Sequence, residues 1–494
     1  MATTQHLEIE AKYDLPEGAE VPDLLGVGPV ARVDELPVQV LTATYYDTAD
    51  LALQQHRVTL RRRTGGSDDG WHLKLPVAGG ERLEVRRPLG SRPAVPLPLR
   101  RLLVAIAAED QPLVPVATLV THRAVRHLVG PGGAVLAELA DDLVTVERHG
   151  SEVLRWRELE VELVEGDPDL LAGLDAAVRA AGLQPAAASS KIGRVLSAGS
   201  SGRSVSWTPR LRAATAAEAL LAESAERLRV LDAMARAGRA GAASELEQAV
   251  RRRRSAVDLA RRLGAVAADV AAEQRRELAW ADGALAGAAH VDAAAALVRE
   301  SVKGQPAELV LGPVARRLDR ELAARRRSGQ QEVAGLLDSP RWLRLVAAGQ
   351  VVGDGRGPRL GKALPDLAAR TSRRLERRLR DLADAADQEL DERLAAARRA
   401  ADAALLVHDV AGRAGVRLPR STGHVASSSE LLDRLAAVLG ARDLARATGV
   451  AAHLAGENGF TFGRLHGLLD AQAAAVVRQL RAERKALRQA RRKA

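Results

Sequence analysis

The first part of the chain alternates between apolar and polar positions. In residues 6–13 every second side chain is apolar. A β-strand with this spacing carries its apolar side chains on one face and its polar side chains on the other. The apolar face holds Leu7, Ile9, Ala11 and Tyr13, and the polar face holds His6, Glu8, Glu10 and Lys12. One such strand is ordinary, but the same alternation of acids and bases with aliphatic residues returns on several later segments.

These segments predict a sheet over the first 163 residues. Their connections at 65–70, 79–80 and 130–133 are short and rich in Gly, Ser or Asp, which favours hairpins and therefore an antiparallel sheet or barrel. Helices are predicted within 97–108, 168–181 and 186–196. The further strands are predicted at 38–46, 57–63, 70–76, 81–88, 116–128, 134–139, 143–148 and 153–163.

Beyond a Ser/Gly-rich linker at 199–209, the apolar period changes from two to about 3.6 residues. We therefore predict a strand-rich domain at 1–198 and an all-helical domain at 210–494, which together make an α+β chain. A Gly-rich stretch near 340–362 would divide the helical domain into two bundles. Its helices are predicted at 212–237, 241–266, 270–285, 291–301, 307–327, 366–383, 387–414, 428–440, 441–455 and 463–492.

Composition excludes several kinds of chemistry. The chain has no cysteine, which excludes disulfides, thiolate metal sites and cysteine nucleophiles. Neither a signal peptide nor a run of about 18 apolar residues is visible, so a cytoplasmic protein without a membrane span is expected. Residues 1–200 hold 21 Lys and Arg against 28 Asp and Glu, a net of −7, whereas the remainder has a net of +17. A polyanion-binding surface is therefore favoured in the second part.

The charged strand faces have two interpretations. They are either the solvated outer faces of a sandwich, or they line the interior of a closed barrel. A barrel lined by both signs of charge must be wet and hold a charged ligand, because unpaired buried charge is costly. Its carboxylates would bind hard divalent cations, and its Arg and Lys side chains would bind phosphate oxygens. The pattern alone leaves both interpretations open.

The order of these segments resembles the CYTH domain, the domain of triphosphate tunnel metalloenzymes. The resemblance covers nearly all of residues 1–198. It begins with Glu8-x-Glu10-x-Lys12 and continues through the segments 45–48, 60–63, 71–76, 81–88, 121–123, 137–142, 158–163 and 190–191. It implies a closed, eight-stranded antiparallel barrel, which favours the second interpretation.

The resemblance also implies the roles of individual residues. The catalytic residues would be Lys12, Glu160 and Glu162. Residues that bind substrate phosphate would be Lys12, Arg61, Arg63, Lys74, Arg86, Arg123 and Lys191. Ligands for Mg²⁺ or Mn²⁺ would be Glu8, Glu10, Asp142, Glu160 and Glu162, with Glu158, Glu84 and Arg82 as weaker candidates for the site.

The helical part resembles the CHAD domain, which binds polyphosphate, but several signature positions differ, including Ala401 and Asp402 in place of an expected Arg and Tyr. Ser244 and Asp391 stand where histidines are expected, and Glu247 stands where an arginine is expected. Whether this domain still binds polyphosphate is therefore left open. Arginines at helical spacing suggest a polyanion surface, although a solvated helix face is the ordinary alternative. Its candidates are Arg251, Arg252, Arg254, Arg370, Arg373, Arg374 and Arg377.

The leading hypothesis is a metal-dependent hydrolase of inorganic triphosphate, polyphosphate or a related triphosphate, with a helical domain that binds or localises polyanion. A non-catalytic polyphosphate-binding protein and an adenylate cyclase are the alternatives. Polyphosphate granules are one conceivable location within the cytoplasm. Nucleic acid is not expected as a partner, since aromatic residues for stacking make up only 2% of the chain. The pattern leaves the substrate, the oligomeric state and the choice between one and two metals open.

Overall fold

The computed structural model describes residues 4–90, 93–147, 154–196, 205–348 and 357–493. The chain divides into two compact units, Met1–Arg203 and Ser204–Ala494, and each is described by itself. The predicted linker at 199–209 and the predicted division near 340–362 both fall partly outside the described residues.

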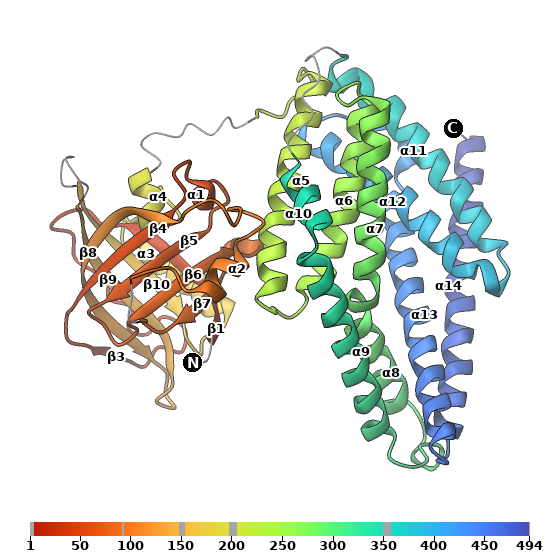
Figure 1. Cartoon of the computed structure of the whole chain (residues 1–494), viewed down its shortest axis with the longest axis horizontal. Helices are drawn as coiled ribbons and strands as arrows, with labels where there is room; N and C mark the ends of the chain where they lie inside the picture. Colours follow the sequence, from red (N-terminus) through yellow and green to blue (C-terminus); the bar gives the residue numbers. More distant parts are fainter. Residues whose placement is uncertain (1–3, 91–92, 148–153, 197–204, 349–356, 494) are drawn as a thin grey trace. The chain divides into compact units, whose positions relative to one another are not determined.

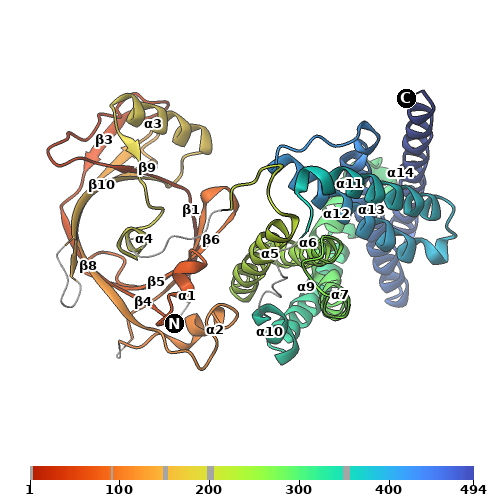
Figure 2. The ribbon, with the colours of Figure 1, turned by 90° about the horizontal axis from the view of Figure 1, so that it is seen from above.

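The N-terminal unit is an antiparallel sheet that curls into a ring around the helix α4 (Lys191–Leu196) (Figures 1 and 2). Its strands follow the order β1-β7-β6-β5-β4-β8-β9-β10-β2-β11, and β3 pairs with β8. The strands are β1 (Thr4–Glu8), β2 (Glu10–Asp14), β3 (Arg32–Glu35), β4 (Gln39–Asp47), β5 (Thr59–Thr64), β6 (Gly70–Pro76), β7 (Arg82–Arg87), β8 (Val114–Val129), β9 (Val135–Glu147), β10 (Leu154–Leu163) and β11 (Gln184–Pro185).

The predicted closure of the barrel needs a correction. The opening segment is interrupted at Ile9: β1 pairs with β7, and β2 pairs with β10. The two ends of the sheet therefore meet within one piece of chain, where the amide N–H of Leu163 donates to the carbonyl of Ile9 at 3.0 Å. The ring is completed because the first part of this segment pairs with β7 and the second part pairs with β10. Hydrogen-bonded pairing among the described strands is therefore not continuous around the ring. The sheet contains eleven strands, many of them short, in place of the eight that were expected.

Tertiary contacts also join elements that the sequence had separated. The strands predicted at 134–139 and 143–148 form the single strand β9, in which Asp141 and Asp142 pair with arginines of both neighbouring strands. The helices predicted on either side of residue 440 form the single helix α13, in which Gly440 lies close to Ala294 of a neighbouring helix.

The apolar strand faces point outward, so the sandwich interpretation is wrong. Leu159 and Val161 of β10 pack with Leu170 and Leu174 of α3 (Pro168–Ala180) in one buried cluster. The side chain of Asp167 caps α3 by accepting from the amide N–H of Leu170 at 2.8 Å. Since successive strand residues face opposite ways, the charged side chains point into the ring.

A second apolar cluster lies inside the ring, beside α4. Ile192 and Val195 of this helix pack against Leu119, Val144 and Tyr45 of the sheet. The same inward-facing rows of side chains carry Arg123 and Asp142 further along β8 and β9. The interior is therefore apolar next to α4 and charged beyond it. The short helices α1 (Ala52–Gln55) and α2 (Leu97–Leu102) complete this unit.

The C-terminal unit is all-helical, as predicted, and the chain is of the α+β class (Figure 1). Its main core joins helices from both halves of the unit, with Leu322, Leu375, Ala401, Leu435 and Phe462 in one buried cluster. The short helix α10 was not predicted. Among the described helices, none combines the length and hydropathy of a membrane span. The helices are α5 (Ala213–Arg236), α6 (Ala242–Arg262), α7 (Ala268–Ala289), α8 (Val291–Lys303), α9 (Val314–Leu337), α10 (Pro340–Ala347), α11 (Leu360–Ala383), α12 (Leu390–Arg413), α13 (Val425–Leu454) and α14 (Phe460–Lys493).

Candidate functional site

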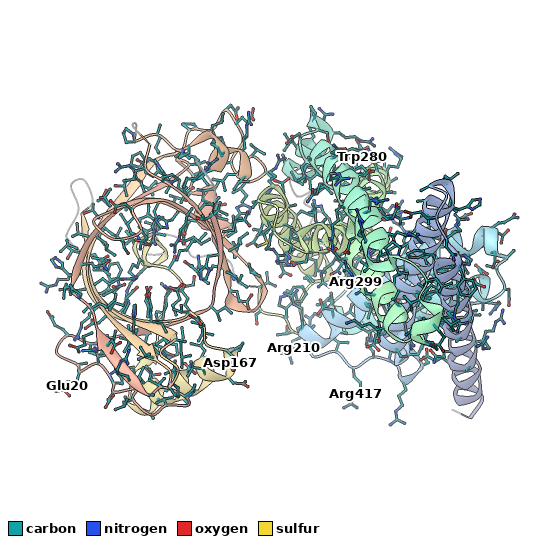
Figure 3. All side chains as sticks on the ribbon, turned by 90° about the horizontal axis from the view of Figure 1, so that it is seen from below. Glu20, Asp167, Arg210, Trp280, Arg299 and Arg417 are labelled. Carbon is teal, nitrogen blue, oxygen red and sulfur yellow. The ribbon has the colours of Figure 1, made fainter. Side chains whose placement is uncertain are left out.

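The ring of strands encloses a cavity of about 230 Å³ that is lined almost entirely by polar side chains. Seen from below in Figure 3, these side chains reach inward from strands all around the ring. The predicted residues that line the cavity are Glu8, Glu10, Lys12, Arg61, Arg63, Lys74, Arg86, Arg123, Glu160, Glu162 and Lys191. The remaining predicted residue of this domain, Asp142, is fully buried directly behind Arg123 and Lys191.

Three buried carboxylates meet around the ammonium group of Lys191. The Lys191 Nζ atom lies 2.8 Å from Asp142 Oδ2, 2.6 Å from Glu158 Oε1 and 2.8 Å from Glu160 Oε1. Burial lowers the pKa of Lys191, but these three charges outweigh it and raise the pKa above its usual value. We call Asp142, Glu158 and Glu160 the carboxylate triad.

Two further cations neutralise the triad. Arg123 forms a bidentate pair with Asp142, with its Nε atom 2.7 Å from Oδ1, and also reaches Glu160 Oε2 at 2.7 Å. Lys12 donates to Glu160 and lies 2.9 Å from Glu10 Oε2. Burial opposes ionisation of Glu160, but Lys12, Lys191 and Arg123 hold its pKa well below the usual range. Glu160 therefore carries a negative charge that three cations offset.

The triad fits a hard divalent cation. Ligand oxygens of its three residues lie within 4.8 Å of one another, and carboxylate oxygen is the donor that Mg²⁺ and Mn²⁺ prefer. Of the predicted metal ligands, the structure brings Asp142 and Glu160 into this group. Glu158, which the sequence ranked lower, is its third member. The signal for Glu158 was its shared face with Glu160 on β10, and the register places it directly opposite Asp142.

The other predicted metal ligands form a second acidic region of the same cavity. Glu10 lies directly opposite Glu162 in the β2–β10 pairing, and Glu8 faces Lys74, with the Nζ atom 2.7 Å from Oε2. Burial, followed by the charge of Glu8, raises the pKa of Glu162 to about 7. This region therefore has more negative charge than its neighbouring cations offset.

The opposite wall has more positive charge than its partners offset. Arg61 and Arg63 of β5 face the cavity, and Arg61 Nη1 donates to the hydroxyl of Tyr45 at 3.4 Å. Burial, followed by the charges of Arg61 and Arg123, lowers the pKa of Arg63 to about 9. Arg63 pairs with Asp68, a cavity-lining residue that the sequence did not identify. Such a wall is suited to an anion.

A buried pair supports Arg86 and Lys74. Glu84 is fully buried, accepts from Arg86, and has His72 Nδ1 at 2.9 Å from its Oε1 atom. Burial lowers the pKa of His72 to about 4, so this histidine is neutral near pH 7. Glu84 does not line the cavity, whereas Arg82, the other weaker candidate, does. The lining residues that were not predicted at all are Tyr45, Thr59, Ser67, Asp68, Glu138, Ser189 and Ser190.

The predicted polyanion residues of the helical unit differ in their surroundings. On α6, Arg252 pairs with Asp409 of α12, and Arg251 lies 3.9 Å from Asp402 of the same helix. The α11 residues Arg370, Arg373 and Arg377 are exposed, and Arg370 pairs with Asp366 one turn away at 2.7 Å. The remaining two residues, Arg254 and Arg374, lie among other arginines.

Six arginines from three helices, Arg254 and Arg374 among them, lie near one another. We call this set the arginine cluster. Burial lowers the pKa of Arg374, and the neighbouring Arg262 and Arg378 add to the effect. Burial and then Arg254 likewise lower the pKa of Arg399. The cluster consists of Arg254, Arg262, Arg374, Arg377, Arg378 and Arg399.

Acids occupy positions next to this cluster. Burial raises the pKa of Glu247, of Asp282 and of Asp402, and arginines such as Arg251 and Arg398 partly oppose the rise. Glu247 is 3% exposed and lies 3.3 Å from Arg251 Nε. Two other departures from the CHAD signature are placed differently. Ser244 is half-buried in the first turn of α6, and Asp391 is exposed in the first turn of α12.

The geometry thus defines an α+β chain with a charged cavity inside a curled antiparallel sheet, followed by an arginine-rich helical unit. Family models match both parts. A CYTH domain matches residues 6–183, and a CHAD domain matches residues 219–426. The chain therefore belongs to the proteins in which a CYTH domain is followed by a CHAD domain.

The curated relatives carry no assigned activity. The uncharacterized protein Rv2226 of Mycobacterium tuberculosis is 42% identical over 214 residues, and the match covers 40% of this chain and 42% of the relative. The corresponding protein of a second strain of this organism matches equally. The chain thus matches less than half the length of these relatives.

The solved structures that match are more distant in sequence. The CHAD domain of the plant Ricinus communis is 17% identical, covers 58% of this chain and 95% of its own, and has a TM-score of 0.44. PptA of Streptomyces chartreusis is 16% identical, covers 56% and 99%, and has a TM-score of 0.43. HpAC1 of Hippeastrum, an adenylyl cyclase candidate described as having a dominant triphosphatase activity, is 20% identical, covers 39% and 96%, and has a TM-score of 0.26.

Proposed function

We propose that the N-terminal domain hydrolyses phosphoanhydride bonds of a triphosphate, with inorganic triphosphate or the end of a polyphosphate chain as the favoured substrate. The observation that carries this proposal is the unequal charge of one enclosed cavity. An arginine wall with too few counter-charges, including Arg61 and Arg63, faces the same space as the acids around Glu162. A phosphate chain with a divalent cation would complement both regions at once.

The basic side chains would bind and align the chain of phosphates. Arg61 and Arg63 offer guanidinium donors to phosphate oxygens from one wall, and Arg123 and Lys12 offer theirs from the neighbourhood of the triad. Few conformations of the phosphate chain satisfy donors on several strands simultaneously. Holding the scissile bond in one orientation supplies much of the catalysis in phosphoryl transfer.

The carboxylate triad would hold Mg²⁺ or Mn²⁺. When bound there, the cation would offset negative charge that develops on the phosphate oxygens during bond cleavage. Asp142, Glu158 and Glu160 are fixed for this role by their strand positions and by Arg123. Among the described residues, no Ser or Thr lies in a nucleophile–histidine–carboxylate arrangement within the cavity lining, so water is the expected nucleophile.

Phosphate release tests this proposal. The full chain should release phosphate from inorganic tripolyphosphate in the presence of Mg²⁺ or Mn²⁺, and a panel with ATP and long-chain polyphosphate would rank the substrates. A chain that releases no phosphate from any of them with either cation contradicts the proposal. Tight polyphosphate binding without turnover would instead support a non-catalytic polyphosphate-binding protein. Cyclic AMP formed from ATP would support an adenylate cyclase.

We propose a second role for the helical domain, namely the binding of polyanion, because the arginine cluster concentrates positive charge at the meeting of α6, α11 and α12. Its neighbouring acids, led by Glu247, reduce this charge. Binding of long-chain polyphosphate by the full chain, with the cavity inactivated, tests this role separately from hydrolysis.

A further inference from the structure

Lys191 occupies the position that a metal would take. Its ammonium group has three N–H donors, and each of the three triad residues places one carboxylate oxygen 2.6–2.8 Å from Nζ. These are the same three residues whose oxygens lie within 4.8 Å of one another. A divalent cation held by all three carboxylates would therefore compete with this ammonium group for them.

The charges around the triad also exclude a metal while Lys191 remains there. Three cations lie at the three carboxylates, since Lys191 contacts all three, Arg123 binds Asp142 and Glu160, and Lys12 binds Glu160 while it also contacts Glu10. A divalent cation added while all three remain would be repelled by them in a buried site. The removal of one lysine charge from the triad relieves part of this repulsion.

The Lys191 side chain can also contact a ligand in the cavity, because it lines the cavity as well as contacting the triad. It is the first residue of α4, and the preceding Ser189 and Ser190 also line the cavity. A phosphate chain in this cavity would bring several negative charges next to the ammonium. Lys191 could then bind phosphate oxygens and leave the triad oxygens to the metal.

We propose that Lys191 is an internal counter-cation that keeps the carboxylate triad closed to divalent metal until a phosphate chain draws it away, so that metal and phosphate bind cooperatively. This inference rests on the proposed function for the identity of the anion. It makes Lys191 a residue that regulates metal entry, in addition to the phosphate contact that the resemblance implies.

The test measures Mn²⁺ binding to the full chain by equilibrium dialysis, without any turnover. In the absence of phosphate, Lys191→Met should bind Mn²⁺ at least about tenfold more tightly than the wild type, because one positive charge has left the triad. At equal free Mn²⁺, the non-hydrolysable analogue imidodiphosphate should raise Mn²⁺ binding of the wild type. It should change the binding of Lys191→Met much less.

Lys74→Met is the matched control. It removes the same charge from the same cavity, but Lys74 pairs with Glu8 outside the triad. If Lys74→Met gains as much Mn²⁺ affinity as Lys191→Met, or if Lys191→Met gains none, the inference is wrong. Glu158→Gln should remove the Mn²⁺ site that Lys191→Met gains, which assigns that site to the triad.

If the Lys191 variant does not fold, Mn²⁺ binding by the wild-type chain still tests the inference. Tight Mn²⁺ binding by the wild-type chain without any anion, at a site that Glu158→Gln removes, overturns the inference. These results are separable from the proposed function. A failure of phosphate release leaves the Mn²⁺ measurements interpretable, and an unchanged Mn²⁺ affinity in Lys191→Met leaves the hydrolysis test in force.

Discussion

The two units of this chain handle buried charge in different ways. In the N-terminal cavity, acids and bases alternate with apolar residues on strands, so the sheet encloses both signs of charge within one space. In the helical unit, several arginines of α6 and α11 pair with acids of their own or neighbouring helices. The cavity therefore has walls of opposite excess charge that a ligand can balance. In the helical unit, positive charge that neighbouring acids do not fully offset is found mainly in the arginine cluster.

The largest expected effect tests the cavity. Glu160→Gln should reduce phosphate release from tripolyphosphate by about a hundredfold or more, because Glu160 is a triad member that also pairs with Lys12, Lys191 and Arg123. Initial rates at saturating Mg²⁺ measure this. Glu138→Gln is the control, since Glu138 lines the same cavity outside the triad. Equal losses in the two variants would show that the triad has no special role.

The next effect concerns pH. A depressed pKa of about 9 means that Arg63 is charged below pH 9 and loses its charge as the pH rises through that value. The KM for tripolyphosphate should therefore rise about tenfold above pH 9, because a charged hydrogen bond to phosphate is lost. Arg63→Met should have the high KM already at pH 7.5 and no rise above pH 9. A wild-type KM that stays constant up to pH 11 would contradict this assignment.

A smaller effect is expected in the helical unit. Arg374→Gln combined with Arg399→Gln should weaken binding of labelled long-chain polyphosphate about threefold to tenfold, since these residues concentrate the charge of the arginine cluster. Fluorescence anisotropy measures this on a Glu160→Gln background that does not consume the ligand. Arg370→Gln, on the same helix but paired with Asp366, should bind like the parent. Equal weakening by Arg370→Gln would mean that only net charge matters.

The smallest effect is a gain. Glu247→Gln should strengthen polyphosphate binding about twofold, because the buried carboxylate that partly neutralises Arg251 is removed. The same anisotropy titration detects it, and tripolyphosphate hydrolysis should not change. A loss of affinity in Glu247→Gln would show that Glu247 orients Arg251 for binding and does not compete with the ligand.

Much of the cavity could be predicted because strand parity is local. Since residues i and i+2 of one strand share a face, Glu10 and Lys12 had to point the same way, as did Glu158, Glu160 and Glu162. This alternation could not show whether the charged face of each strand points to solvent or into the interior of a barrel. The outward packing of Leu159 and Val161 against α3 decided it. The division of the acids into a triad and a second region depended on cross-strand register, which spacing alone does not reveal.

The helical unit was harder to predict because its charges meet across helices. The spacing of Arg370, Arg373, Arg374 and Arg377 indicated one stripe, but only Arg374 and Arg377 join the arginine cluster. Its other members Arg254 and Arg399 come from α6 and α12, which are distant in sequence. A helical stripe shows which residues share a face, and helix packing determines what that face meets.

By itself, the sequence determined the two-part organisation, the alternation of charge on the strands and the kinds of side chain available to a phosphate ligand. These follow from local spacing and composition, and no distant contact is needed to read them. Only the tertiary structure placed the charged faces inside the ring, moved Glu158 into the triad and brought Lys191 between its three carboxylates. The reason is physical: α4 is far from β9 and β10 in the chain, and the position of an ammonium group among carboxylates depends on how these elements fold together.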